Sequence, residues 1–201
     1  MAGRGIRRRR GLVLVLALLV PGKVPAAGGE DLALWRTLDW FRGAWRGREA
    51  GLLGEGRGLR CVQDLFAGRF MLLRTRSELQ LASDRSERRT FVYWQLLGRD
   101  PDSGRITLTQ YESAGYRRRF ELDAAASRPD GLVFRARFLG DASPARTGRL
   151  TLRVLGEGLY AETLELGESR STLREVRRSR WQRLETQPEA CAAERLRLPE
   201  P

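Results

Sequence analysis

A two-residue alternation decides the fold, and it is clearest at residues 132–138, LVFRARF, where one face is apolar and the other carries Arg135 and Arg137. The same period returns at residues 150–154, LTLRV. Successive side chains of a β-strand point to opposite faces of its sheet. The pattern is therefore typical of strands in an antiparallel sheet that buries one face.

Similar runs occupy most of the chain after residue 43, and turn residues separate them, as in DPDSG at 100–104, PDG at 129–131 and GEG at 156–158. The runs span residues 44–48, 58–66, 69–81, 90–97, 105–112, 116–122, 132–139, 149–155, 159–166 and 171–184. A meander of this kind leaves two unpaired edges, and closure removes them. The sequence predicts an all-β protein, a roughly ten-stranded antiparallel up-and-down β-barrel, with a β-sandwich as the alternative.

One short helix is expected before the strands, at residues 31–41, because Leu34, Trp35, Leu38 and Phe41 recur at helical spacing. The length of 201 residues suits one domain with a tail. We expect a signal peptide at 1–28, a barrel domain at 29–184, and a loosely ordered tail at 185–201 with a marginal helix at 190–196.

The first residues have the layout of a secretory signal peptide. A basic segment at 1–10 precedes the apolar run GLVLVLALLV at 11–20, and small residues follow at Val24 and Ala26. Cleavage after Ala26 is preferred, with Gly28 as the second site. The run is too short to span a bilayer, which takes about 20 residues. We expect a periplasmic or secreted protein without a stable membrane anchor after cleavage; an uncleaved anchor is the alternative.

The expected signal peptide at 1–28 also accounts for much of the net charge of +12. Six of the 37 basic residues and none of the 25 acidic residues lie in residues 1–28. The run Arg117–Arg119 and the arginines of 174–183 are interpreted as a solvated strand face, because acidic residues are dispersed among them. We expect no nucleic-acid partner, and the sequence leaves the oligomeric state open.

The chain contains no histidine. This excludes a Ser-His-Asp triad, a Cys-His pair, His-ligated zinc and His-bound haem. Cys61 and Cys191 are a candidate disulfide if the protein is exported, although two unpaired cysteines are an equal alternative. We expect no metal site and no cofactor.

Four motifs resemble the lipocalin-like (calycin) barrels, and most closely the nitrobindin-like group with its exported bacterial relatives. They are LDWFRGAWRG at 38–47, GRFMLLRTR at 68–76, LGRDPDSGRITL at 97–108 and RWQRL at 180–184. The resemblance covers about residues 32–184. It implies a barrel around a cavity, with the helix at one end and Trp45 packed at the barrel floor as a structural residue. Haem binding is not carried over, because the histidine that holds haem in nitrobindin has no counterpart here.

Polar residues on the apolar-rich strand faces are the candidate ligand site. An inward arginine could bind a carboxylate or phosphate through two hydrogen bonds. Arg118 and Glu162 could instead simply pair, and a register error of one residue would turn every side chain to the other face. The residues expected to line the interior are Tyr93, Gln110, Arg118, Glu162 and Arg178.

We therefore expect an exported, non-catalytic protein that binds a small apolar or amphipathic molecule with an anionic group. Two alternatives remain open. One is a cofactor-free enzyme that uses glutamate and arginine groups, Glu112 and Glu162 among them, inside the barrel. The other is a structural or interaction protein whose barrel is filled by its own side chains.

Overall fold

The computed structural model describes residues 35–113, 115–140 and 145–193. The expected signal peptide at 1–28 and the first part of the expected helix lie outside these residues. Within them, no helix is both long enough and apolar enough to span a membrane.

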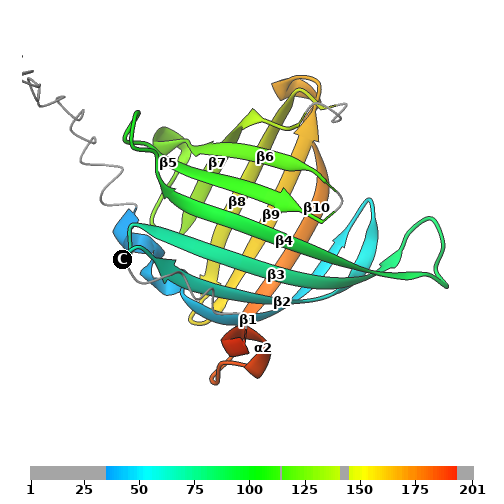
Figure 1. The fold of residues 1–201 in the computed structure, drawn as a ribbon. Helices are drawn as coiled ribbons and strands as arrows, with labels where there is room; N and C mark the ends of the chain where they lie inside the picture. Colours follow the sequence, from blue (N-terminus) through cyan, green and yellow to red (C-terminus); the bar gives the residue numbers. More distant parts are fainter. Residues whose placement is uncertain (1–34, 114, 141–144, 194–201) are drawn as a thin grey trace, which may run out of the picture.

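The protein is all-β, and ten antiparallel strands close into a barrel (Figure 1). Each strand pairs with its neighbour in sequence, and the first pairs with the last. The predicted barrel is confirmed, and the sandwich alternative is wrong. The strands are β1 (Gly43–Gly51), β2 (Gly54–Leu65), β3 (Phe70–Leu81), β4 (Arg88–Arg99), β5 (Ile106–Glu112), β6 (Arg117–Leu122), β7 (Gly131–Phe138), β8 (Thr147–Gly156), β9 (Leu159–Gly167) and β10 (Arg174–Arg183).

Local chemistry makes the turns. Between β4 and β5 the Asp100 side chain accepts a hydrogen bond from the Ser103 N–H at 2.8 Å. Gly104 follows with a φ of 69°, which glycine adopts without steric cost. Short turns of this kind hold consecutive strands antiparallel, so the meander needs no long connection.

A short helical segment precedes β1. Residues 35–37 are helical and continue into the 3-10 helix η1 (Leu38–Phe41). Leu38 and Phe41 are fully buried in the cluster that fills the barrel interior. The Arg183 guanidinium donates to the Arg42 carbonyl at 2.6 Å, so η1 lies where β1 begins and β10 ends. The N-terminal helix is thus confirmed for the part of the chain that is described.

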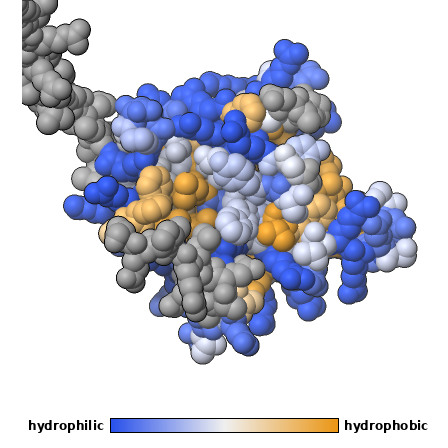
Figure 2. Space-filling view, in the orientation of Figure 1, coloured by the Kyte–Doolittle hydropathy of each residue, from blue (hydrophilic) through white to orange (hydrophobic). Residues whose placement is uncertain are grey.

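The barrel interior holds apolar side chains and three rows of polar ones. The apolar cluster includes Leu73, Leu97, Ile106, Leu108, Phe120, Phe134, Leu150 and Leu164. The polar rows follow strand register and comprise Arg60–Thr75–Tyr93–Glu112, Gln95–Gln110–Arg118 and Glu49–Ser179–Glu162. On the face seen in Figure 2, hydrophilic side chains surround patches of apolar ones.

Part of the expected loose tail is ordered. Helix α2 (Glu189–Ala193) lies outside the barrel, below β1 and β2 in Figure 1. A disulfide joins Cys191 to Cys61 of β2, with a Cα–Cα distance of 5.6 Å. The pair packs against Ala44, and Arg74 donates to the Cys191 carbonyl at 3.1 Å. The cysteine pair is therefore bridged in the structure.

Candidate functional site

A buried carboxylate with two arginine partners lies at the centre of the polar interior. Arg60 of β2 reaches across the barrel to Glu162 of β9, with its Nη1 2.6 Å from Oε2, and both side chains are 2% exposed. Arg177 of β10 donates to the other carboxylate oxygen, Oε1, at 2.7 Å. Both oxygens of Glu162 are thus occupied by guanidinium groups.

The Arg60 guanidinium is fixed by further contacts. Its Nε donates to Thr75 Oγ1 at 2.8 Å, and its Nη1 donates to the Tyr160 hydroxyl at 2.8 Å. Its plane lies 4.2 Å from the centre of the Trp181 ring, within cation–π range. Three strands, β3, β9 and β10, therefore hold this one side chain, apart from the strand that carries it.

The ionisation of this group follows from its partners. Burial alone would raise the pKa of Glu162, but the charges of Arg60 and Arg177 outweigh it and hold the pKa below its ordinary value of 4.5. Burial also opposes the charge of Arg60, yet Glu162 keeps the pKa of Arg60 above its ordinary value. The pair is ionised at neutral pH.

Tyr93 lies beside the second arginine. The Arg177 guanidinium lies 5.0 Å from the centre of the Tyr93 ring. Burial raises the pKa of Tyr93 to about 12, although the positive charge of Arg177 acts in the opposite direction. The phenol therefore stays protonated and can donate a hydrogen bond at neutral pH.

Two more carboxylates lie in the interior. Glu49 is 4% exposed and accepts a hydrogen bond from the Ser77 hydroxyl. Glu112 pairs with Arg118 at 3.0 Å. Three inward-facing arginines, Arg60, Arg118 and Arg177, thus accompany the three inward-facing glutamates. Among the described residues, no cluster of carboxylates and cysteines is arranged to hold a metal ion.

Several buried polar atoms on the inner face have no hydrogen-bond partner in the described part of the chain. Such atoms are costly to bury, and each needs an explanation. The inner-face donors are Arg118 Nε, Arg177 Nε, Trp181 Nε1, Gln110 Nε2 and the Ser179 hydroxyl, and the one inner-face acceptor is Gln95 Oε1. Donors therefore predominate among the unpaired atoms.

Two glycines make room for the Trp181 indole. A Cβ at Gly47 would overlap the six-membered part of the ring, and a Cβ at Gly58 would come within 2.8 Å of its edge. Gly47 is the second glycine of the Gly-x-Trp-x-Gly segment, and Trp45 is the residue between the two glycines. Trp45 is itself 1% exposed and meets the Tyr160 ring edge-on, with centroids 4.8 Å apart.

Four of the five expected site residues face inward. Tyr93, Gln110 and Glu162 are at most 3% exposed, and the Arg118 side chain is 14% exposed. Their role in ligand binding stays a prediction. The suggestion that Arg118 pairs with Glu162 is wrong, because each of the two has other partners.

The inward prediction for Arg178 is also wrong. Its side chain is 68% exposed on the outer face and pairs with Glu175 at 3.0 Å. The strand face assigned to the interior was the wrong one of the two: Arg177, Ser179 and Trp181 point inward instead. A register shift between Glu175 and Arg177 interrupts the period of β10.

Sequence reasoning missed Arg60, Arg177, Glu49 and Ser77. Trp181 was the available signal for β10, because a tryptophan on an otherwise polar strand marks the buried face. Glu49 shares the face of Trp45 by simple alternation. No such signal existed for Arg60, since an arginine between two small or apolar neighbours normally indicates an outward position.

The crystal structure of Rv2717c from M. tuberculosis is similar in fold. It matches with a TM-score of 0.53 and 12% sequence identity, over 79% of this chain and 99% of that chain. No protein-family model matches the sequence, and no curated protein matches it. Identity this low concerns the fold alone.

Proposed function

We propose that the barrel binds a small molecule whose head group is anionic or rich in hydrogen-bond acceptors. The unpaired donors of the inner face carry this proposal. A ligand oxygen near Arg177 Nε, Trp181 Nε1 or Gln110 Nε2 would satisfy groups that otherwise remain buried without partners. The apolar cluster beside them suits the remaining part of an amphipathic molecule.

The chemistry of Glu162 favours binding over catalysis. A general acid or base works best when its pKa lies near the operating pH. The pKa of Glu162 is lowered instead, and both of its oxygens are held by arginines. A carboxylate in this state is a structural anion that orients Arg60 and Arg177, so we propose a non-catalytic role for the site.

We further propose that the protein is an exported member of the lipocalin-like barrels, close to the nitrobindin-like group but without haem ligation. The entry of η1 into β1 and the ten-stranded antiparallel closure support this assignment. The Cys61–Cys191 disulfide supports a periplasmic or secreted location, because disulfides persist in oxidising compartments. Residues 1–28 would then act as the signal peptide.

Native mass spectrometry of gently purified protein tests the binding proposal directly. We expect a co-purified small molecule whose mass disappears on denaturation. The probe for variants is the anionic amphipathic dye 8-anilinonaphthalene-1-sulfonate. We expect Gln110→Leu to weaken dye binding roughly tenfold, the value of one hydrogen bond, and we expect Thr109→Val, on the other face of β5, to leave it unchanged.

The proposal fails if no small molecule co-purifies under several growth conditions and the two variants bind the dye equally. That result would favour a barrel filled by its own side chains, with a structural role. A measured turnover that is lost in Glu162→Gln would favour the enzyme alternative instead.

A further inference from the structure

Three arginines face one another across neighbouring strands on the outside of the barrel. Arg48 of β1 lies directly opposite Arg180 of β10 on one side and Arg57 of β2 on the other. All three are exposed. Opposite residues in a sheet have Cβ atoms about 5 Å apart, and like charges in such positions destabilise the pairing. We name Arg48, Arg57 and Arg180 the arginine row.

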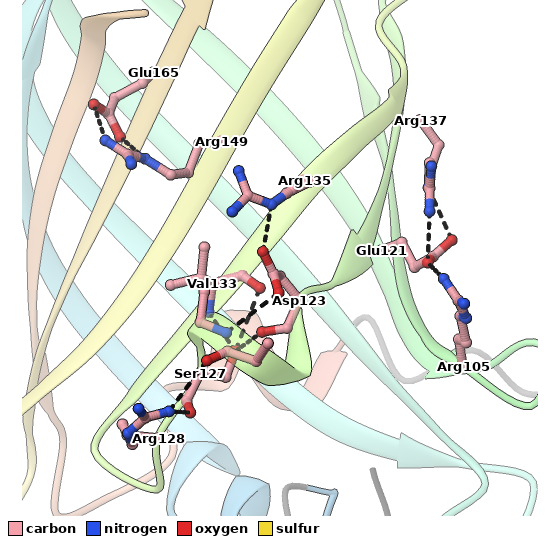
Figure 3. Close-up of polar contacts among 12 residues, drawn as sticks. Arg105, Glu121, Asp123, Ser127, Arg128, Val133, Arg135, Arg137, Arg149 and Glu165 are labelled. Atoms are coloured by element: carbon pink, nitrogen blue, oxygen red, sulfur yellow. Dashed lines mark hydrogen bonds and ion pairs between the residues drawn. The ribbon is translucent and has the colours of Figure 1, made fainter. Parts of the chain in front are cut away.

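The arginine row has no ion-pair partners among the described residues. Several outward arginines over β5–β9 are paired with acids, as Figure 3 shows. Arg137 pairs with Glu121 at 2.8 Å, and Arg149 donates to Glu165 at 2.6 Å. Arg117 and Arg153 also point outward on these strands without an ion-pair partner in the described chain. The arginine row differs in placing three such arginines directly opposite one another.

The row also borders an open groove in the outer surface. Five arginines line it, and they outnumber the three glutamates of its lining. The charged lining residues are Arg48, Arg57, Arg88, Arg178, Arg180, Glu49, Glu55 and Glu78. Arg46 lies two residues before Arg48 on the same face and likewise has no ion-pair partner in the described chain. Positive charge thus predominates on β10, β1 and β2, although Glu55 of β2 is also exposed and Glu78 of β3 lies opposite Arg57.

The hairpin that carries this charge ends in two exposed leucines. Leu52 is 72% exposed and Leu53 is 54% exposed. The Leu52 N–H donates to the Val176 carbonyl at 3.0 Å, and the Leu53 carbonyl accepts from the Ala82 N–H at 3.0 Å. The neighbouring strands therefore fix the backbone of the tip, while both apolar side chains remain in solvent, at the end of the barrel opposite η1 (Figure 1). Exposed apolar groups beside charge mark an interaction site.

The spacing between leucines and arginines suits a lipid interface. Arg48 and Leu52 are four residues apart along the hairpin, and so are Leu53 and Arg57. At about 3.3 Å per residue this is roughly 13 Å. A long arginine side chain can bend toward a phosphate while its stem covers apolar surface. Leucines that enter the acyl boundary would thus leave the row at the level of the head groups.

We propose that the outer face of β10, β1 and β2, with the Leu52–Leu53 tip, docks on the surface of an anionic phospholipid bilayer. The row supplies the electrostatic attraction to the lipid phosphates, and the leucines supply the apolar contact. The face fits nucleic acid less well, because its outward residues among those described include no aromatic side chain on which a base could stack. The row points outward and the interior site is built from inward side chains, so different substitutions test the two proposals and either can fail alone.

Vesicle co-sedimentation of the full chain tests this proposal. The probes are vesicles of phosphatidylcholine alone and of phosphatidylcholine mixed with phosphatidylglycerol, at lipid concentrations below saturation. We expect binding to the mixed vesicles only. The double variant Arg48→Gln/Arg57→Gln should lower the partition coefficient roughly tenfold or more, and Leu52→Ser/Leu53→Ser should lower it as well.

The matched control is Arg137→Gln/Arg149→Gln, which makes the same change in net charge at paired arginines. It should change the partition coefficient far less. Residues 1–34 are identical in all variants, so their contribution cancels in the ratios. Removal of like charges from the row should leave the thermal midpoint equal or higher; if the double variant misfolds, the single variant Arg180→Gln replaces it.

Three results would overturn the proposal. If the control loses as much binding as the row variant, the attraction depends on net charge and not on this face. If the leucine variant binds vesicles as the parent does, the tip makes no apolar contact. Loss of binding to a duplex DNA oligonucleotide in the row variant, with vesicle binding intact, would assign the face to nucleic acid.

Discussion

Arg60 and Glu162 are 102 residues apart in sequence and form an ion pair of 2.6 Å inside the barrel. The contact ties β2 to β9, which are not neighbours in the sheet. A buried pair adds little net stability when it replaces apolar packing, because both charges lose their hydration. Removal of one partner is different, since the other charge is then left buried alone.

We therefore expect Glu162→Gln to lower the free energy of unfolding by about 3–5 kcal/mol. The variant leaves Arg60 and Arg177 as neighbouring buried cations without their carboxylate. Urea unfolding measures the change. Glu165→Gln is the control, because its carboxylate pairs with Arg149 at the surface and such pairs contribute about 0–1 kcal/mol. Equal losses in the two variants would contradict the central role given to Glu162.

The same carboxylate predicts a pH dependence. Its pKa in the folded protein lies below 4.5, the ordinary value expected in the unfolded chain. The stabilising contribution is therefore complete above pH 4.5 and is lost as the pH falls through the lower folded pKa. We expect the difference in unfolding free energy between the parent and Glu162→Gln to shrink below pH 4.5. A difference that stays constant through this range would show that the charge of Glu162 is not its source.

Substitution of Gly47, whose Cα lies against the Trp181 indole, tests how closely β1 and this side chain are packed. Gly47→Ala places a methyl group inside van der Waals contact with the indole, so we expect a loss of about 1–3 kcal/mol. Gly131→Ala is the control, because no atom lies within 4 Å of its added Cβ. Thermal or urea unfolding measures both. Combining Gly47→Ala with Trp181→Phe should restore part of the loss, and no recovery would place the cause elsewhere.

The disulfide should contribute measurably to stability. We expect Cys61→Ser to cost about 2–5 kcal/mol under oxidising conditions, the usual effect of losing a native disulfide. A reducing agent should lower the stability of the parent to a similar degree and leave that of Cys61→Ser unchanged. If the variant responds to the reductant as the parent does, the bond is not the source of the difference.

The strands were predictable because their alternation reports burial directly. On β9, Tyr160 and Leu164 alternate with smaller or polar residues and place Glu162 inside. On β10 the arginines obscure this signal, and the register shift after Glu175 breaks the period, so Arg178 was assigned to the interior in place of Arg177. The partner of Glu162 could not be foreseen, because Arg60 reaches it across the barrel and no local pattern encodes such a contact.

Because of its position, the disulfide can form only when the last strand has closed the barrel. Cys191 follows β10, and β10 completes the ring by pairing with β1, which lies beside the strand of Cys61. A chain whose last strand has not found its place keeps Cys191 away from its partner and retains two reactive thiols. A thiol titration would then measure the misassembled fraction.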